Sequence, residues 1–373
     1  MKNGTRNNSD AVHHLYVHFP FCARICPYCA FYKTRGSAAE VQQFCHALEL
    51  EVEIASNTYP FSLETIFLGG GTPTALSTAQ LRNLCETFRR VFDLRALSEW
   101  SIEANPGSVG QKKAEALRSG GINRISLGVQ SWDDDLLQLL GREHNAAQAR
   151  RSFQVFRAAG FENISIDLMF ALPGQTEEQW RATLQRTIDL HPEHVSTYCL
   201  TYEEDTEFLS RFSRGEFHAN DDGEARFFEI SISVLESAGY QHYEISNFAQ
   251  PGFRSRHNQA YWQGADYLGL GPSAWSTRGF KRWQNVASHR EYARRLFAGE
   301  SAVDLDEELT KAMKRTERIA LGLRTSDGIP SSLVAEKRAH DLVDGGLLFE
   351  MDNRFFLSRT GKLVADSVAE ELV

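Results

Sequence analysis

The sequence predicts an α/β protein: a partial (β/α)6 TIM-like barrel followed by a small C-terminal α+β domain. Three observations support this. Between His14 and Ser237, six short apolar runs alternate with helical runs, which predicts a parallel sheet covered by helices. Distinctive cysteine, glycine and polar residues fall at the ends of the first five strands, where barrels build their active sites. From about Ala302 the pattern changes to helices followed by a hairpin.

The expected elements follow one another along the chain. Strands are expected over residues 14–19, 64–68, 99–103, 124–129, 163–168 and 194–200. Helices are expected over residues 38–56, 77–91, 111–118, 134–140, 146–158, 177–190 and 222–237, with Ser77 as an N-cap. The C-terminal part is expected to hold a helix over 310–323, a second over 331–345, a hairpin around 351–353 and a last helix from 360.

Length and composition define the broad class. A chain of 373 residues, 42% hydrophobic, can bury one large core and one small core. We expect domains over residues 1–300 and 301–373. The N-terminus is polar with no apolar segment after it, and no run approaches the length of a membrane span. A soluble cytoplasmic protein is therefore expected.

Charge and cysteine usage argue against two classes of protein, extended nucleic-acid binders and proteins built on a disulfide framework. The formal net charge of −9 argues against extended nucleic-acid binding. Six cysteines in so long a chain do not make a disulfide framework. Three of them, Cys45, Cys85 and Cys199, fall inside apolar patterns and are predicted to be core residues.

The other three thiols, Cys22, Cys26 and Cys29, lie on one loop directly after the first strand. A cubane 4Fe-4S cluster usually takes four thiolates, so three leave one iron with an open position. An open position is where a cofactor or substrate coordinates. The spacing alone also allows a zinc site with a fourth ligand from elsewhere, such as His18, or incidental cysteines.

The ends of the next strands carry further candidates. The second strand ends in Gly-Gly-Gly-Thr-Pro over residues 69–73, which is expected to present bare backbone N–H groups; a simple tight turn is the alternative. Glu103 ends the third strand, Gln130 ends the fourth, and Asp167 lies near the end of the fifth. The alternative for Glu103 and Asp167 is that they cap helices. We expect all these residues to share one rim with the cysteine loop.

The C-x3-C-x2-C spacing, with the aromatic Tyr28 before the last cysteine, resembles the signature of the radical S-adenosylmethionine (SAM) superfamily. The resemblance implies a 4Fe-4S cluster whose open iron chelates the amino and carboxylate groups of SAM. An electron from the cluster then releases a 5′-deoxyadenosyl radical. The glycine segment resembles the one in which backbone groups at Gly71 and Thr72 meet the amino group of SAM.

Over nearly the whole chain the sequence resembles the HemN/HemW group of heme-metabolism proteins. The matching segments are 167–176, 243–249, 257–262 and 267–272. The resemblance implies that SAM is contacted by Tyr16, Tyr28, Glu103, Gln130, Arg142 and Asp167. These residue types suit the task, since an arginine binds a carboxylate and an aspartate accepts from ribose hydroxyls. Taken singly, an arginine or aspartate is more often part of a surface ion pair.

Two features separate the branches of this group. The coproporphyrinogen dehydrogenases carry a further cysteine at the position of Phe31 and lack the H-N-x-x-Y-W box that begins here at His257. In the heme chaperones the histidine of that box is associated with heme. Neutral imidazole is a good axial ligand for iron, and Tyr261 and Trp262 are expected to form a stacking wall. The alternative is that His257 is a hydrogen-bonded core histidine.

The sequence departs from the chaperone pattern at two places. Ala30 replaces a common aspartate after the third cysteine, in the surroundings that tune the potential of a cluster. Trp275-Ser276 replaces a common His-Gly and removes an auxiliary ligand. The C-terminal part resembles a winged-helix-like module, and its acidic end favours a lid or docking role over DNA binding.

The resemblance therefore implies a heme chaperone that holds a 4Fe-4S cluster, SAM and heme and transfers heme to an acceptor hemoprotein. In it, SAM and cluster would serve structure, redox control or dimerisation. The alternatives are oxygen-independent coproporphyrinogen III dehydrogenase and another radical SAM tetrapyrrole enzyme. Whether the protein is an enzyme is left open; cleavage of SAM would require an electron donor of the flavodoxin or ferredoxin type. A homodimer and peripheral membrane contact are also left open.

Overall fold

The computed structural model describes residues 11–218 and 220–373 and confirms the α/β class. The polar segment at the N-terminus, on which the expectation about targeting rests, lies outside the described residues. Six strands pair in parallel in chain order, as predicted. They are β1 (Val12–Phe19), β2 (Phe61–Gly70), β3 (Glu99–Ala104), β4 (Arg124–Gln130), β5 (Ile164–Phe170) and β6 (His194–Cys199).

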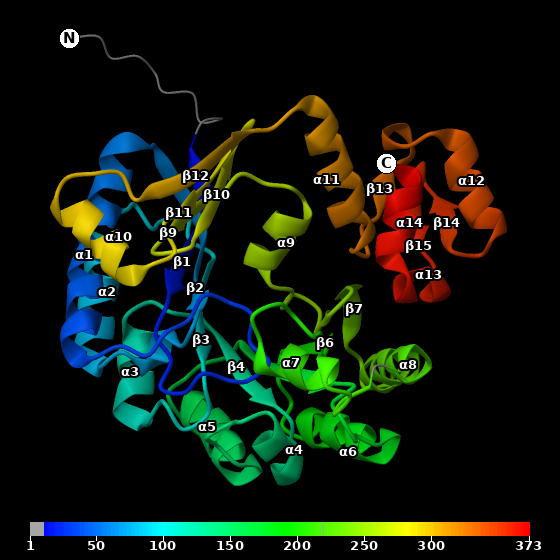
Figure 1. Ribbon diagram of the computed structural model, residues 1–373, viewed down its shortest axis with the longest axis horizontal. Coiled ribbons are helices and arrows are strands. Elements are labelled where there is room, and N and C mark those ends of the chain that lie inside the picture. Colours follow the sequence, from blue (N-terminus) through cyan, green and yellow to red (C-terminus); the bar gives the residue numbers. More distant parts are fainter. Residues whose placement is uncertain (1–10, 219) are drawn as a thin grey trace.

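Helices cover the outer face of this curved sheet (Figure 1). They are α1 (Ala38–Thr58), α2 (Thr78–Val91), α3 (Gln111–Ser119), α4 (Asp134–Leu139), α5 (Ala146–Ala158), α6 (Glu177–Ile188) and α8 (Asp221–Ser237). The short helix α7 (Glu207–Ser213) instead contacts the cysteine loop, where the N–H of Phe208 donates to the carbonyl of Pro27 over 3.1 Å. Four of them begin with a capping box, at Ser37, Ser77, Asn145 and Thr176. Each box satisfies backbone N–H groups that the first turn of a helix leaves unpaired, so these helices start where the sequence directs.

Short strands that the sequence pattern did not reveal extend both edges of the sheet. β9 (Leu268–Leu270) lies parallel to β1, while β8 (Asn247–Ala249) and β7 (Gln241–Glu244) add antiparallel to β6. Strands of three or four residues are too short to show a clear period in the sequence. In the chain, α9 (Arg256–Trp262) lies between β8 and β9, and it contacts β2, to the right of which it is drawn in Figure 1.

The rest of the chain forms two smaller sheets. One is antiparallel and contains β10 (Trp275–Arg278), β11 (Lys281–Asn285) and β12 (Val303–Glu308), with α10 (His289–Phe297) between the last two strands. The other has the order β13 (Ile329–Pro330), β15 (Arg354–Leu357) and β14 (Leu348–Met351). Around it lie α11 (Lys311–Leu323), α12 (Glu336–Asp344), α13 (Arg359–Leu363) and α14 (Ala365–Leu372).

The described part of the chain contains three apolar clusters, and two of them hold these parts together. The large one packs the strands of the main sheet against the covering helices. The small one begins in α11 and joins Ile319, Leu323, Phe355 and Val368. β12 pairs with β11, although it lies after residue 300. The division of the chain into domains stays a prediction.

Successive side chains of a strand point to opposite faces of the sheet, so alternate residues face the interior of the barrel. Leu15 and Val17 of β1 are fully buried in the large apolar cluster. Tyr16, between them, points to the other face and lines an internal cavity. Among the described residues no helix is both long and apolar enough to cross a membrane.

Candidate functional site

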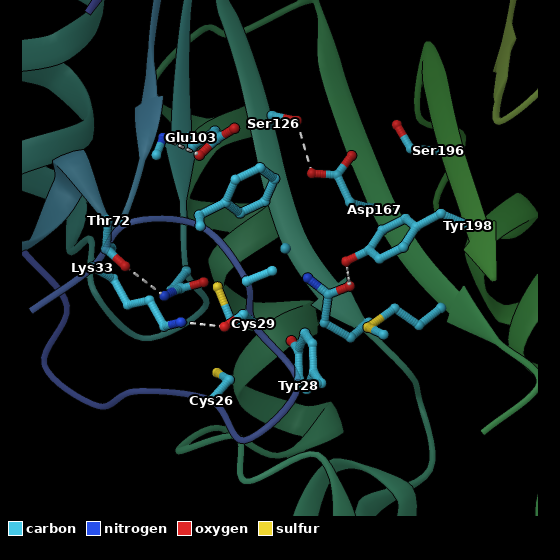
Figure 2. Close-up of a pocket in the computed structure, with 18 of the residues that line it drawn as sticks. Cys26, Tyr28, Cys29, Lys33, Thr72, Glu103, Ser126, Asp167, Ser196 and Tyr198 are labelled. Atoms are coloured by element: carbon cyan, nitrogen blue, oxygen red, sulfur yellow. Dashed lines mark hydrogen bonds between the residues drawn. The ribbon is translucent and has the colours of Figure 1, made fainter. Parts of the chain in front are cut away.

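A cavity of about 800 Å³ lies inside the barrel and reaches the carboxyl ends of the strands. Figure 2 shows part of its wall, with the cysteine loop on one side and side chains from several strands facing it. The twelve residues that the sequence singled out all line this cavity: Tyr16, Cys22, Cys26, Tyr28, Cys29, Gly71, Thr72, Glu103, Gln130, Arg142, Asp167 and His257. The fold thus gathers them in one place, and their individual roles stay predictions.

Polar side chains approach two of the three thiols. The Thr72 hydroxyl donates to Cys22 Sγ and the Arg142 guanidinium donates to Cys26 Sγ, both over 3.6 Å. Burial raises the pKa of the Cys22 and Cys29 thiols. Such donors stabilise sulfur once it carries negative charge, as it does when it binds a metal.

A hydrogen-bonded network behind the loop fixes these donors. Arg142 also donates to Asn105 Oδ1 over 2.6 Å and to the Gly128 carbonyl over 2.7 Å. The amide of Asn105 in turn donates to Thr72 Oγ1 over 2.8 Å. Thr72, Asn105 and Arg142 therefore form one continuous polar wall from Cys22 to Cys26.

The glycine segment does not present bare backbone N–H groups, so that prediction is wrong. The N–H of Gly71 donates to the carbonyl of Phe19 over 2.6 Å, and the N–H of Thr72 donates to the carbonyl of Phe21 over 2.9 Å. A Cβ atom at Gly71 would lie 2.7 and 2.8 Å from the same two carbonyl oxygens. Glycine is required here because the cysteine loop packs directly on the backbone.

Two partly buried acids of the wall, Glu103 and Asp167, differ in their surroundings. Burial, together with the nearby charge of Asp167, raises the pKa of Glu103 to about 8, and the Gly70 N–H donates to its carboxyl group over 3.1 Å. Asp167 accepts from the hydroxyls of Ser126 over 2.7 Å and Ser165 over 2.8 Å. Neither acid caps a helix, so the alternative that Glu103 and Asp167 are helix caps is wrong.

Tyrosines fill the space between the acids and the cysteine loop. The Tyr198 hydroxyl donates to Gln130 Oε1 over 2.5 Å, and the backbone of Gln130 has a positive φ of 69° at an irregularity between β4 and β5. The Tyr16 hydroxyl lies 3.0 Å from His18 Nδ1. Burial raises the pKa of Tyr16, Tyr28 and Tyr198, so their phenols are neutral at physiological pH.

The helix α9 closes another side of the cavity through His257, Asn258 and Tyr261. His257 is 1% exposed; its Nδ1 lies 2.7 Å from Thr65 Oγ1 and its Nε2 lies 3.0 Å from the Tyr261 hydroxyl. Burial lowers its pKa to about 3. His257 is therefore a neutral, hydrogen-bonded histidine that also faces the cavity. Trp262 does not line the cavity; its ring lies under the Arg324 guanidinium.

A carboxylate from β3 holds this helix in place. Glu99 accepts from the backbone N–H of Arg256 over 2.9 Å and of His257 over 3.1 Å, and the Ser255 hydroxyl lies 3.5 Å away. A negative charge at the first turn of a helix is stabilising, because unpaired N–H groups point toward it.

The structure also places Phe31 and the two residues that depart from the family pattern, Ala30 and Trp275. Phe31 is 70% exposed and lines the cavity beside Ala30, so no additional thiol stands at this position. Trp275 is partly exposed and does not line the cavity.

Comparisons with known proteins agree with this geometry. A family model described as the radical SAM superfamily matches residues 16–187. The heme chaperone HemW of Bacillus subtilis is 37% identical over 368 residues, which cover 95% of this chain and 97% of the relative. The heme chaperone HemW of Lactococcus lactis is also 37% identical, over 84% of this chain and 82% of the relative. The chain belongs to the HemW family.

A solved structure supports the fold assignment for this HemW family member. Coproporphyrinogen III oxidase (HemN) from Escherichia coli superposes with a TM-score of 0.85 and covers 97% of this chain and 90% of its own. At 24% identity this likeness shows that the two proteins share a fold.

Membership of the radical SAM superfamily implies a 4Fe-4S cluster and SAM. The residues fit a cluster, because three thiols face one cavity and hydrogen-bond donors approach two of them. In the part of the chain that the structure describes, no three His, Cys, Asp or Glu side chains are arranged to hold a single metal ion. A cubane cluster distributes its thiolates over separate irons, so it does not need such an arrangement.

The sequence analysis did not predict some of the residues that line the cavity. The cavity is also lined by Asn105, Arg124, Ser126, Ser196, Tyr198 and Asn247. A signal for some of them was present, because Arg124, Ser126, Gly128 and Gln130 follow the period of two that places alternate residues on one face of a strand.

Proposed function

We propose that this HemW family member is a heme chaperone. It holds a 4Fe-4S cluster on Cys22, Cys26 and Cys29, binds SAM and heme, and transfers heme to acceptor hemoproteins. The observation that supports this best is the position of α9: His257 and Tyr261 face the same cavity as the three cysteines. The chaperone function is named in the curated relatives, which align with almost the whole chain.

In this proposal SAM occupies the cluster end of the cavity. The cluster supplies an iron with an open coordination position. Arg142, fixed next to Cys26, binds the carboxylate of SAM, and Asp167 accepts from the ribose hydroxyls. Gln130 provides an amide for either group.

Other wall residues orient SAM. The carbonyls of Gly71 and Thr72 suit its amino group, because an amine bound to iron still has N–H bonds to donate and the N–H groups of both residues are already paired. Glu103 lies behind them, and Tyr16 and Tyr28 pack on either side.

His257 is the proposed iron ligand for heme. Donation of its Nδ1–H to Thr65 leaves the lone pair of Nε2 facing Tyr261, and heme iron replaces the phenol hydrogen at that nitrogen. The low pKa keeps the imidazole neutral, which is the form that binds iron. Phe31 at the mouth supports a chaperone over the dehydrogenase branch, which carries a cysteine there.

Several partners belong to the proposal. An acceptor hemoprotein receives the heme, and an electron donor of the flavodoxin or ferredoxin type is needed only if SAM is cleaved. Free thiols for the cluster fit a reducing compartment such as the cytoplasm.

The test is an anaerobic titration with hemin of the cluster-reconstituted protein, followed through the Soret band. His257→Ala is compared with His14→Ala, a matched control whose Nδ1 lies 3.0 Å from the same Thr65 hydroxyl but which does not line the cavity. We expect saturable binding at one site that His257→Ala abolishes or shifts and His14→Ala preserves. Absence of binding to the wild type would refute the chaperone function. Identical spectra for wild type and His257→Ala would refute the proposal that His257 is the iron ligand.

A further inference from the structure

Arg124 is a buried cation whose side chain has no hydrogen-bond or ion-pair partner among the described residues. It begins β4, is only 2% exposed and lines the cavity. Among the described residues its Nε hydrogen finds no acceptor, and no carboxylate forms an ion pair with the guanidinium. A guanidinium stays charged in proteins, so its burial without an anion is unfavourable.

The three acids near this part of the barrel are engaged elsewhere. Glu99 accepts from two backbone N–H groups of α9, and both oxygens of Asp167 accept from serine hydroxyls. Glu103 accepts from the Gly70 N–H and is largely protonated near neutral pH, because burial raises its pKa to about 8. Arg124 is near enough to Glu103 to lower the pKa of that carboxyl group, but burial outweighs this effect. No carboxylate of the described residues therefore forms a direct ion pair with Arg124.

The surroundings of Arg124 suit a carboxylate that enters from the cavity. The neighbouring wall carries the neutral polar side chains Ser126, Ser196, Asn247 and Asn258. Arginine presents its N–H groups as a planar fork that matches a carboxylate with two parallel hydrogen bonds. The cavity of about 800 Å³ lies within the usual size of small-molecule sites.

Two kinds of carboxylate are available in the proposed function, that of SAM and the propionates of heme, and the two cavity arginines Arg142 and Arg124 lie at different places. Arg142 stands 3.6 Å from Cys26, at the cluster end, where SAM's methionine group is proposed to bind. Arg124 is six residues before Gln130 on the same strand, which corresponds to roughly 20 Å. It is close enough to His257 for its charge to help keep that imidazole neutral.

We propose that Arg124 binds a propionate carboxylate of the tetrapyrrole whose iron is held by His257. This inference rests on the proposed function and makes it specific for porphyrins with free propionates. Recognition then has two fixed points, the iron at α9 and a carboxylate at the amino end of β4.

The test compares hemin with hemin dimethyl ester, whose propionates are uncharged. We expect wild-type protein to bind the ester about 10- to 100-fold more weakly, which is the contribution of one hydrogen-bonded charge pair. Arg124→Met should bind hemin as weakly as wild type binds the ester, and bind the ester as wild type does. Arg124→Lys should recover part of the difference. Arg282→Met is the control, because Arg282 pairs with Glu317 over 2.7 Å outside the cavity.

The outcomes separate the inference from the function on which it rests. Equal wild-type affinity for hemin and its ester overturns the role of Arg124 and leaves the chaperone function standing; this comparison needs no variant to fold. Equal weakening of both ligands by Arg124→Met also overturns it, since a purely structural role would act on both. If Arg124→Met loses SAM binding but binds hemin unchanged, the carboxylate that Arg124 binds belongs to SAM, and the propionate proposal is overturned. Failure of wild type to bind hemin overturns both proposals.

Discussion

The attachment of α9 to the barrel offers a sharp test, because it depends on one carboxylate. Glu99 is 3% exposed and accepts from the backbone N–H groups of Arg256 and His257, over 2.9 and 3.1 Å. Glu99→Gln keeps the shape of the side chain but replaces one accepting oxygen with an NH2 group that faces an N–H. One hydrogen bond to a charged acceptor is lost, and a negative charge disappears from the start of a helix.

The magnitude follows from these two effects. A hydrogen bond to a charged group contributes about 1.5–3 kcal/mol, and a charge at a helix N-terminus adds about 0.5–2 kcal/mol when partly buried. We therefore expect the local free energy of opening of α9 to fall by about 2–5 kcal/mol. This corresponds to amide hydrogen exchange about 30- to 4,000-fold faster wherever α9 opens locally.

The measurement is hydrogen exchange by mass spectrometry on peptides that cover residues 255–262. Glu64→Gln is the control, because the half-exposed side chain of Glu64 pairs with His13 over 3.2 Å and accepts no hydrogen bond from α9 among the described contacts. Faster exchange confined to α9, with weaker hemin binding, is the expected result for Glu99→Gln. Wild-type exchange rates in Glu99→Gln would refute the idea that this carboxylate anchors the helix.

Other predictions concern the cluster end of the cavity. Anaerobically purified wild type should be brown, and Cys26→Ala should lose the broad visible absorption; a colourless wild type would contradict the cluster. In cofactor-free protein, the raised pKa of Glu103, about 8, contributes stability that is fully present below the unfolded pKa of about 4.5 and is lost as pH rises through about 8. Urea titrations should thus show wild type losing up to about 1.4 kcal/mol per pH unit relative to Glu103→Gln across this window, and parallel curves would disprove the assignment. Gly71→Ala should reduce iron content on reconstitution, because its Cβ meets two backbone carbonyls, whereas Gly110→Ala, with open space at its Cβ, should retain the iron; equal iron in both would contradict the packing argument.

The sequence alone determined the features that depend on local spacing. The three cysteines lie within eight residues, so any loop conformation keeps them together, and the six parallel strands follow from short apolar runs alternating with helices. The ends of consecutive parallel strands meet at one edge, which is why Glu103, Gln130 and Asp167 were expected beside the loop.

Only the tertiary structure decided which atoms meet. The glycine segment looked like a source of free N–H groups, but the loop after β1 packs on it and takes those of Gly71 and Thr72. Glu99 and His257 stand 158 residues apart, and no periodic pattern connects a strand to the helix that it anchors. The tertiary structure also decided that the buried Nε of Arg124 finds no acceptor among the described residues, because Asp167 and Glu99 accept hydrogen bonds from other donors. Hydrogen bonding is short-ranged and directional, so pairings between distant segments are fixed by packing.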